Sequence, residues 1–131
     1  MEQDKDLLNK AKIVSENAYA PYSKFKVGAA IEYENGNIYT GCNVENASYG
    51  LSICAERNAV SNAVSSGEKS KIKTVAIYSP NQKKCMPCGA CRQWIAEFSS
   101  DNTRIILEDD DNKIISMTLE EIFPNAFSIE G

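Results

Sequence analysis

The stretch Pro87-Cys88-Gly89-Ala90-Cys91 places two cysteines three residues apart, directly after a proline. This spacing predicts that both thiols lie on one face of the first turn of a helix, where free backbone N–H groups and the helix dipole favour thiolates. A third cysteine stands in Cys54-Ala55-Glu56. Zinc held by three protein ligands keeps its fourth position open, which is typical of catalytic zinc. Cys54 is therefore the candidate third ligand, and Glu56 is the candidate proton carrier.

Length and composition limit the kinds of protein that this chain can be. Its 131 residues fit a single domain, residues 1–131, with a real hydrophobic core. The net charge is -4, and the run Glu108-Asp109-Asp110-Asp111 is acidic, so no nucleic acid partner is expected. The charged N-terminus lacks a signal-peptide pattern, and no apolar run approaches the ~18 residues of a membrane span. We therefore expect a cytoplasmic protein that does not bind membranes.

The cysteine and histidine counts limit the chemistry further. Five cysteines, an odd number without a secretion signal, favour thiols and metal binding over a disulfide framework. The chain has no histidine, which excludes an imidazole acid, base or metal ligand. Proton transfer must therefore use a carboxylate, a lysine, a tyrosine or a metal-bound water.

Apolar spacing and turn residues predict an α/β fold. Asn35-Gly36 is a strong signal for a two-residue hairpin turn, and about four residues join the last two strand-like runs, too few for a parallel crossover. We expect a three-layer α/β/α sandwich with a five-stranded mixed sheet, in which strands 1 and 2, and strands 4 and 5, are antiparallel. The three thiols should meet at the ends of neighbouring strands. The expected helices cover residues 5–18, 55–64 and 88–98 and a short turn from Thr118; the expected strands cover residues 26–33, 37–44, 73–79, 104–108 and 113–117.

Four blocks of the sequence resemble the small, homotetrameric, zinc-dependent cytidine deaminases of the cytidine/deoxycytidylate deaminase superfamily. A fifth, weaker block is Thr118-Leu119 with Pro124-Asn125-Ala126-Phe127. The four main blocks are Pro21-Tyr22-Ser23-Lys24-Phe25-Lys26-Val27-Gly28-Ala29-Ala30, Gly41-Cys42-Asn43-Val44-Glu45-Asn46-Ala47, Cys54-Ala55-Glu56-Arg57-Asn58-Ala59 and Pro87-Cys88-Gly89-Ala90-Cys91-Arg92-Gln93.

This resemblance implies hydrolysis of cytidine and deoxycytidine to uridine and deoxyuridine, with release of ammonia, in pyrimidine salvage. Cys54, Cys88 and Cys91 would hold one Zn²⁺ per subunit, and Glu56 would move a proton from the attacking water to N3 and then to the leaving amine. The pKa of Glu56 would have to be raised by a closed pocket.

Three thiolates would leave the zinc site with a net negative charge, so a nearby group should withdraw charge from the sulfurs. Arg57 or Arg92 could do so, and the resemblance favours Arg57.

The resemblance also implies the substrate contacts. Asn43 and Glu45 would bind the ribose 3′-hydroxyl, Phe25 would pack on the pyrimidine, and the Ala55 backbone N–H would meet the base carbonyl. Phe127 would enter the pocket of a neighbouring subunit, which implies a homotetramer. Tyr49 is a further candidate for a subunit interface.

Other interpretations remain open. Cys85 extends the motif to C-x₂-C-x₂-C, but Met86 precedes a proline and favours extended backbone, so Cys85 should lie away from the ligand face. Cys42, within a strand pattern, should be a small buried residue. A deaminase of the blasticidin-S type is the alternative enzyme, and a structural zinc module with Cys85 or Cys42 as the fourth ligand is the alternative without catalysis. A nucleic-acid deaminase is disfavoured because the relatives that act on nucleic acids usually have a histidine at the position of Cys54.

Overall fold

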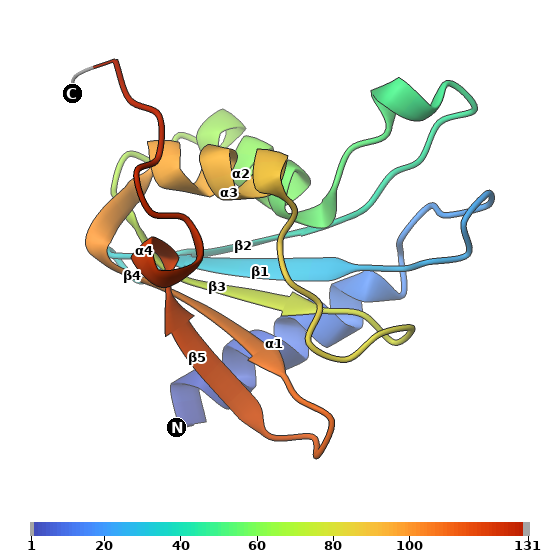
Figure 1. Cartoon of the computed structure of the whole chain (residues 1–131), viewed down its shortest axis with the longest axis horizontal. Coiled ribbons are helices and arrows are strands. Elements are labelled where there is room, and N and C mark those ends of the chain that lie inside the picture. Colours follow the sequence, from blue (N-terminus) through green and yellow to red (C-terminus); the bar gives the residue numbers. More distant parts are fainter. Residues whose placement is uncertain (1, 130–131) are drawn as a thin grey trace.

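The structure, a computed structural model, describes residues 2–129 and centres on one mixed β-sheet (Figure 1). Within those residues the sheet has five strands in the order β2-β1-β3-β4-β5. β1 is antiparallel to β2 and β3, β3 is parallel to β4, and β4 is antiparallel to β5, so the predicted mixed sheet and both predicted hairpins are confirmed. The elements are α1 (Glu2–Ser15), β1 (Gly28–Tyr33), β2 (Ile38–Cys42), η1 (Tyr49–Leu51), α2 (Ala55–Ser65), β3 (Ile72–Tyr78), α3 (Gly89–Glu97), β4 (Ser99–Glu108), β5 (Ile114–Thr118) and α4 (Leu119–Ile122).

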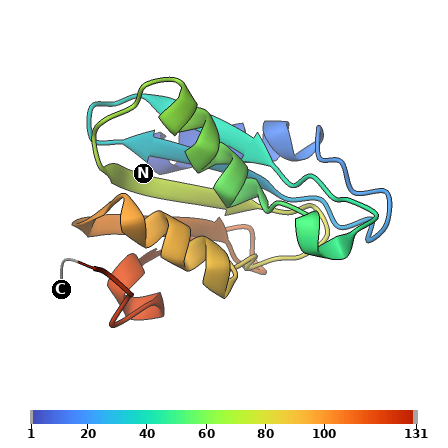
Figure 2. The same cartoon turned by 90° about the horizontal axis from the view of Figure 1, so that it is seen from above.

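Helices cover both faces of the sheet, as the sequence predicted. On one face, Leu7, Leu8 and Ala11 of α1 are buried against small and branched residues of the central strands. On the other face, α2 (green) lies beside α3 (orange) in Figure 2, and their apolar residues join the larger core cluster. The buried residues of α2 and α3 in that cluster are Ala55, Ala59, Val60, Ala63 and Ile95. The result is the expected three-layer α/β/α sandwich.

Two glycines allow helices to approach the sheet closely. A Cβ atom on Gly28 of β1 would lie 2.1 Å from the Ala11 carbonyl oxygen of α1, and one on Gly41 of β2 would lie 2.4 Å from the Ala59 nitrogen of α2. Real Cβ atoms do not approach backbone atoms so closely, so each position requires the absence of a side chain. Gly41 therefore sets the distance between β2 and α2, the helix that begins directly after Cys54.

Side chains of α2 also bind the edge strand β2. Asn58 Nδ2 donates to the Cys42 carbonyl oxygen (2.8 Å), and Asn62 Nδ2 donates to the Thr40 carbonyl oxygen (3.3 Å). Four residues along a helix span about 6 Å, and two residues along a strand span nearly the same distance. The two asparagines can therefore reach alternate carbonyl groups of β2.

Several element boundaries differ from the predicted ones; β1 begins at Gly28 rather than at residue 26, and β2 ends at Cys42 rather than at residue 44. α1 ends at Ser15. The backbone N–H groups of the next three residues donate to carbonyl groups three residues earlier, rather than four as in an α-helix. The predicted two-residue turn at Asn35-Gly36 is a three-residue turn over residues 34–36: the Tyr33 N–H donates to the Asn37 carbonyl (2.9 Å), and Gly36 takes a φ of 93°. β4 begins at Ser99 rather than 104, through a pairing of Ser99 with Ile72 that the polar residues between do not suggest.

The predicted arrangement of strands at the thiols needs one correction. β2 and β3 lead into the two cysteine-bearing helices, but β1 lies between these two strands in the sheet, so they are not neighbours.

Neither α1 nor any other helix within residues 2–129 is both long enough and apolar enough to span a bilayer.

Candidate active site and metal centre

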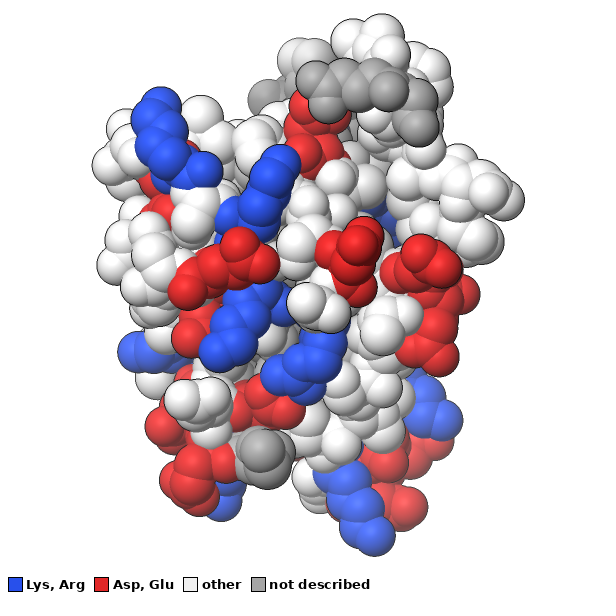
Figure 3. Space-filling view, turned by 90° about the vertical axis from the view of Figure 1, so that its left-hand side faces the viewer, with Lys and Arg blue, Asp and Glu red and all other residues white. Residues whose placement is uncertain are grey.

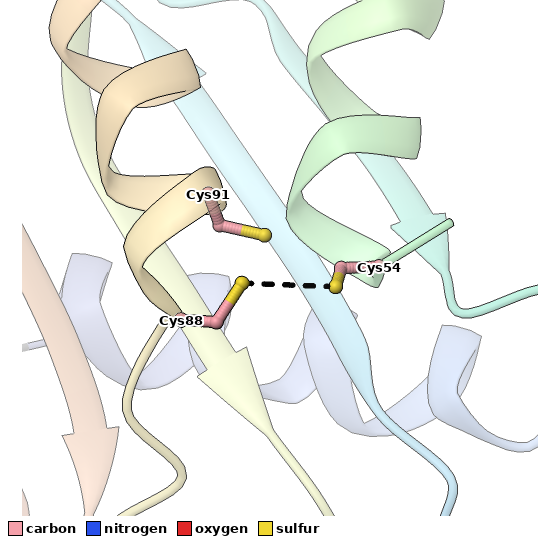
Figure 4. A group of neighbouring side chains, drawn as sticks. All are labelled: Cys54, Cys88 and Cys91. Atoms are coloured by element: carbon pink, nitrogen blue, oxygen red, sulfur yellow. Dashed lines mark hydrogen bonds between the residues drawn. The ribbon is translucent and has the colours of Figure 1, made fainter. Parts of the chain in front are cut away.

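The sulfur atoms of Cys54, Cys88 and Cys91 converge between the starts of α2 and α3 (Figure 4). All three lie within 4.8 Å of one another, and the Sγ atoms of Cys54 and Cys88 are 3.9 Å apart. Cys91 is buried, Cys54 is half-buried and Cys88 is exposed, so the cluster is open to one side. The structure thus brings together the three thiols that the sequence predicted as ligands.

The local backbone explains this convergence. Cys54 and Cys88 each immediately precede a helix in extended conformation, and their carbonyl groups accept the first helical hydrogen bonds, from Asn58 (3.1 Å) and Arg92 (2.9 Å). Neither thiol caps its own helix. Both side chains are therefore free to point toward one another, next to two positive helix ends that favour thiolates.

Arg57, which the resemblance favoured, and Arg92 have different partners. Arg57 Nη2 donates to Cys54 Sγ (3.6 Å) and to the Ser52 carbonyl (3.4 Å). Arg92 instead donates from Nε to the Pro87 carbonyl (2.8 Å) and from Nη1 to the Ile122 carbonyl (2.5 Å). Arg57 is therefore the arginine positioned to draw charge from a ligand sulfur, and Arg92 fastens the start of α3 to the end of α4.

Hydrogen bonds within the cluster favour the thiolate form of Cys54. Its pKa is lowered to about 5, first by the hydrogen bond with Cys91 and then by those with Arg57 and Cys88, which outweigh the opposing effect of burial. The pKa of Cys91 is raised by the same hydrogen bond and by burial.

Glu56 is the second residue of α2 and is only 4% exposed. Burial is the main reason that the pKa of Glu56 rises to about 7, and the negative charge of Cys54 adds to this effect. A carboxyl group with such a pKa can both accept and release a proton near neutral pH. This is the direction of shift that the proposed proton carrier requires.

Asn43 and Glu45 shape the segment around Phe25. Asn43 Oδ1 accepts from the Val27 N–H (2.9 Å), and Asn43 Nδ2 donates to the Phe25 carbonyl (2.8 Å). The Glu45 carboxylate accepts the N–H groups of Tyr22 (3.1 Å) and Ser23 (3.2 Å) and the Ser23 hydroxyl, whose hydrogen bond is the main cause of its lowered pKa. Both side chains thus fix backbone in this structure, and each keeps unused hydrogen-bonding capacity.

A cavity of about 360 Å³ adjoins Glu45, in the size range of small-molecule sites. Its lining is Tyr22, Ser23, Glu45, Asn46, Tyr49 and Ser52.

Two aromatic residues that were assigned to subunit contacts are largely uncovered. Phe127 is 73% exposed and Tyr49 is 77% exposed, so neither ring is buried in its own chain; Tyr49 lines the cavity beside Glu45 and meets the Tyr22 ring edge to face. The Phe127 carbonyl accepts from Gln93 Nε2 (3.1 Å), which fixes this part of the C-terminal segment along α3.

The remaining cysteines do not join the cluster. Within residues 2–129 the group of mutually close sulfurs consists of Cys54, Cys88 and Cys91, without Cys85 or Cys42. Cys85 is half-buried against the larger core, and burial raises its pKa to about 11, as expected for an inert thiol. Cys42 is half-buried rather than buried, at the last position of β2. The structure therefore gives no support to a four-cysteine structural module.

The donor set fits a zinc ion. Thiolates are ligands that zinc favours, three protein ligands are typical of catalytic zinc, and two helix starts with Arg57 offset the negative charge. A three-layer α/β fold with such a centre beside a protonatable carboxyl group defines a zinc-dependent enzyme of the hydrolytic type.

Comparison with known proteins identifies the family. Residues 1–107 match the family described as the cytidine and deoxycytidylate deaminase zinc-binding region, and the chain belongs to this family. A cytidine deaminase of Sporosarcina psychrophila is 44% identical over 124 residues, which cover 95% of this chain and 90% of that protein. The crystal structure of a cytidine deaminase from Burkholderia pseudomallei superposes with a TM-score of 0.86 at 39% identity, covering 94% of this chain and 98% of that one.

A blasticidin-S deaminase from Bacillus cereus is more distant, with 30% identity over 113 residues, which cover 81% of this chain and 79% of that protein. The comparisons therefore favour the cytidine deaminases over the alternative enzyme class.

Proposed function

We propose that this protein catalyses the hydrolytic deamination of cytidine and deoxycytidine to uridine and deoxyuridine, with release of ammonia. One observation carries the proposal. The carboxyl group of Glu56 is buried, and Glu56 stands two residues after Cys54, which belongs to a cluster of three convergent thiols. Cys54, Cys88 and Cys91 hold one zinc ion per subunit. Membership of the deaminase family supports both assignments.

The chemistry divides between the metal and the carboxyl group. Zinc supplies Lewis acidity, which makes water a nucleophile near neutral pH. Glu56 accepts a proton from the water that attacks C4 of the pyrimidine and delivers it to N3. Glu56 then takes the second proton, from the hydroxyl now bonded to C4, and passes it to the amine; the C4–N bond breaks and ammonia leaves. Arg57 stabilises the thiolate of Cys54 by its hydrogen bond and so limits the loss of Lewis acidity.

The chain's own residues orient the nucleoside. Phe25 packs on the pyrimidine ring, and Asn43 and Glu45 use their remaining hydrogen-bonding capacity for the ribose 3′-hydroxyl. Ala55 is the first residue of α2, where a backbone N–H has no acceptor within the helix, and this group binds the base carbonyl.

The assembly that we propose is a homotetramer of single-domain subunits, residues 1–131, in which Phe127 completes the site of a neighbouring subunit. The exposure of Phe127 and Tyr49 supports this arrangement. The proposed setting is pyrimidine salvage in the cytoplasm, without a nucleic acid or membrane partner. On the face shown in Figure 3, the described Lys and Arg side chains are interspersed with Asp and Glu, which does not favour a phosphate backbone as a ligand.

The first experiment follows the ultraviolet absorbance of cytidine with purified protein, beside an assay of bound zinc. We expect turnover to uridine by the parent, and no turnover but unchanged zinc content in Glu56→Gln, because glutamine keeps the size of the side chain and loses its proton transfer. Substantial activity of Glu56→Gln would remove Glu56 from the mechanism. A zinc-loaded parent that does not deaminate cytidine would refute the proposed substrate.

Mixed assemblies test the contribution of Phe127 in trans. Phe127→Ala should raise the KM for cytidine with little loss of zinc. When Phe127→Ala subunits are co-assembled with Glu56→Gln subunits, some sites combine an intact Glu56 with an intact Phe127 from a neighbour. Activity at low cytidine concentration should then exceed the sum of the two separate variants. A simple sum would contradict sharing of sites between subunits.

A further inference from the structure

The backbone of residues 25–27, which carries Phe25, is held almost entirely by side chains. Each of its six N–H and C=O groups has a hydrogen-bond partner, and five of the six partners are side-chain atoms. The Phe25 N–H donates to Ser23 Oγ (3.0 Å), and its carbonyl accepts from Asn43 Nδ2. Asn43 also binds both polar groups of Val27, through its Oδ1 and its own N–H (3.2 Å).

The N–H and carbonyl groups of Lys26 are bound by residues that follow β3, on the other side of β1 from Asn43. The Lys26 N–H donates to Asn81 Oδ1 (2.8 Å), and the Lys26 carbonyl accepts from Ser79 Oγ (2.6 Å). The Asn81 N–H in turn donates to Ser79 Oγ (3.1 Å), so the two side chains belong to one turn, residues 79–81. Together, the side chains of Ser79 and Asn81 bind both the N–H and the carbonyl group of Lys26.

The order of the strands explains this arrangement. β1 lies between β2 and β3, and residues 25–27 lead into β1, whereas Asn43 follows β2 and Ser79 follows β3. Pro80 has no N–H to extend the ladder of β3. Side chains from the ends of the two flanking strands therefore replace strand partners, and they hold residues 25–27 in line with β1.

We propose that Ser79 and Asn81 are positioning residues for Phe25: they hold the Lys26 peptide groups and so fix where the Phe25 ring meets the pyrimidine. This inference rests on the proposed function, which assigns Phe25 to the base. Asn81 is exposed and takes no part in the core, so its contribution to folding is small. The turn at residues 79–81 also begins the segment that ends at Cys88, and it links the aromatic side of the site to the thiol side.

Kinetics of matched variants test the proposal. Asn81→Ala and Ser79→Ala should each raise the KM for cytidine roughly three- to tenfold, the effect of one lost hydrogen bond, and leave kcat within about twofold. Asn81→Asp keeps the acceptor oxygen and should restore most of the loss. Asn102→Ala is the control, because Asn102 is an exposed asparagine of β4 whose side chain makes no hydrogen bond within residues 2–129.

A double-variant cycle separates positioning from simple stability. If Asn81 acts through Phe25, Asn81→Ala should change KM little in a Phe25→Leu background. Equal effects of Asn81→Ala in both backgrounds would overturn the proposal, as would an unchanged KM in the single variant. A uniform loss of melting temperature with no selective rise in KM would also overturn it.

Hydrogen exchange of the segment around Lys26, followed by mass spectrometry, tests the anchoring without turnover. The amide of Lys26 should exchange faster in Asn81→Ala than in the parent or in Asn102→Ala. An amide that stays protected in Asn81→Ala would overturn the inference, whatever the substrate. A parent that fails to deaminate cytidine would refute the proposed function instead, so the two failures are distinguishable.

Discussion

Replacing Gly41 by alanine tests how strictly β2 fixes α2 and, through it, the metal centre. The new Cβ would lie 2.4 Å from the Ala59 nitrogen and 2.7 Å from the Ala55 carbonyl oxygen. Ordinary contacts begin at 3.4 Å, so α2 must move by about 1 Å relative to β2. Because a helix moves as a rigid body, the displacement reaches Cys54 and Glu56 at its start.

The expected cost has two parts. Overpacking of this kind destabilises a protein by about 1–3 kcal/mol, which for a chain of this length lowers the melting temperature by roughly 3–15 °C. A displacement of about 1 Å at a reacting group costs on the order of a hundredfold in turnover. Gly41→Ala should therefore lower kcat/KM about a hundredfold and release zinc faster.

Gly28→Ala provides the matched control. It creates a comparable clash, 2.1 Å from the Ala11 carbonyl oxygen, but against α1 on the opposite face, which carries none of the three thiols. Thermal denaturation and the transfer of zinc to a chromogenic chelator are measured for both variants. Both should melt earlier, and only Gly41→Ala should release zinc faster. Equal zinc release in the two variants, or parent-like activity of Gly41→Ala, would refute the reasoning.

Three further predictions concern single side chains. Arg57→Ala should reduce zinc affinity or turnover about ten- to hundredfold, because Cys54 loses its guanidinium partner, and full retention of both would exclude that role. Hydrogen bonds, first from the Ser70 hydroxyl, lower the pKa of Glu68 from 4.5 to about 2, so its stabilisation is present above pH 4.5 and is lost as the pH falls toward 2. Glu68→Gln should flatten the acid side of the melting temperature against pH, and parallel curves would count against this assignment. Cys85→Ala should retain one zinc per subunit by elemental analysis, whereas loss of the metal would make Cys85 a ligand.

Features with local causes were predictable from the sequence. The antiparallel pairing of β4 with β5 follows from a connection too short for a crossover, and the thiol cluster follows from cysteines at two helix starts. The mechanism implied by the resemblance required a raised pKa for Glu56, and burial raises that pKa to about 7.

Features that depend on distant partners were not predictable. Residues 26 and 27 were expected in a strand, but side chains of Asn43, Ser79 and Asn81 replace the strand partners there. The residues in Ser79-Pro80-Asn81 favour side-chain bonds to backbone, which is the signal that could have indicated this arrangement. The extension of β4 depends on Thr103 Oγ1, which donates to the Ile72 carbonyl (2.7 Å).

The choice between Arg57 and Arg92 also depended on tertiary structure. Each follows a helix start that carries a ligand cysteine, so their sequence positions are similar. The Ile122 carbonyl, thirty residues away along the chain, binds Arg92 and removes it from the thiols. This contact with the end of α4, together with the hydrogen bond from Arg57 to Cys54, agrees with the choice of Arg57 that the resemblance favoured.

The two asparagines that α2 extends to β2 have a consequence for how this protein behaves in a crowded solution. An edge strand exposes backbone groups that a foreign strand can join, which is a common route to aggregation. Here the Thr40 and Cys42 carbonyls already accept bonds from Asn62 and Asn58, so an incoming strand would have to compete with a helix of the same molecule. α2 thus protects this edge of the sheet from pairing with another strand. Adding a sixth strand to β2 by design would first require replacement of Asn58 and Asn62.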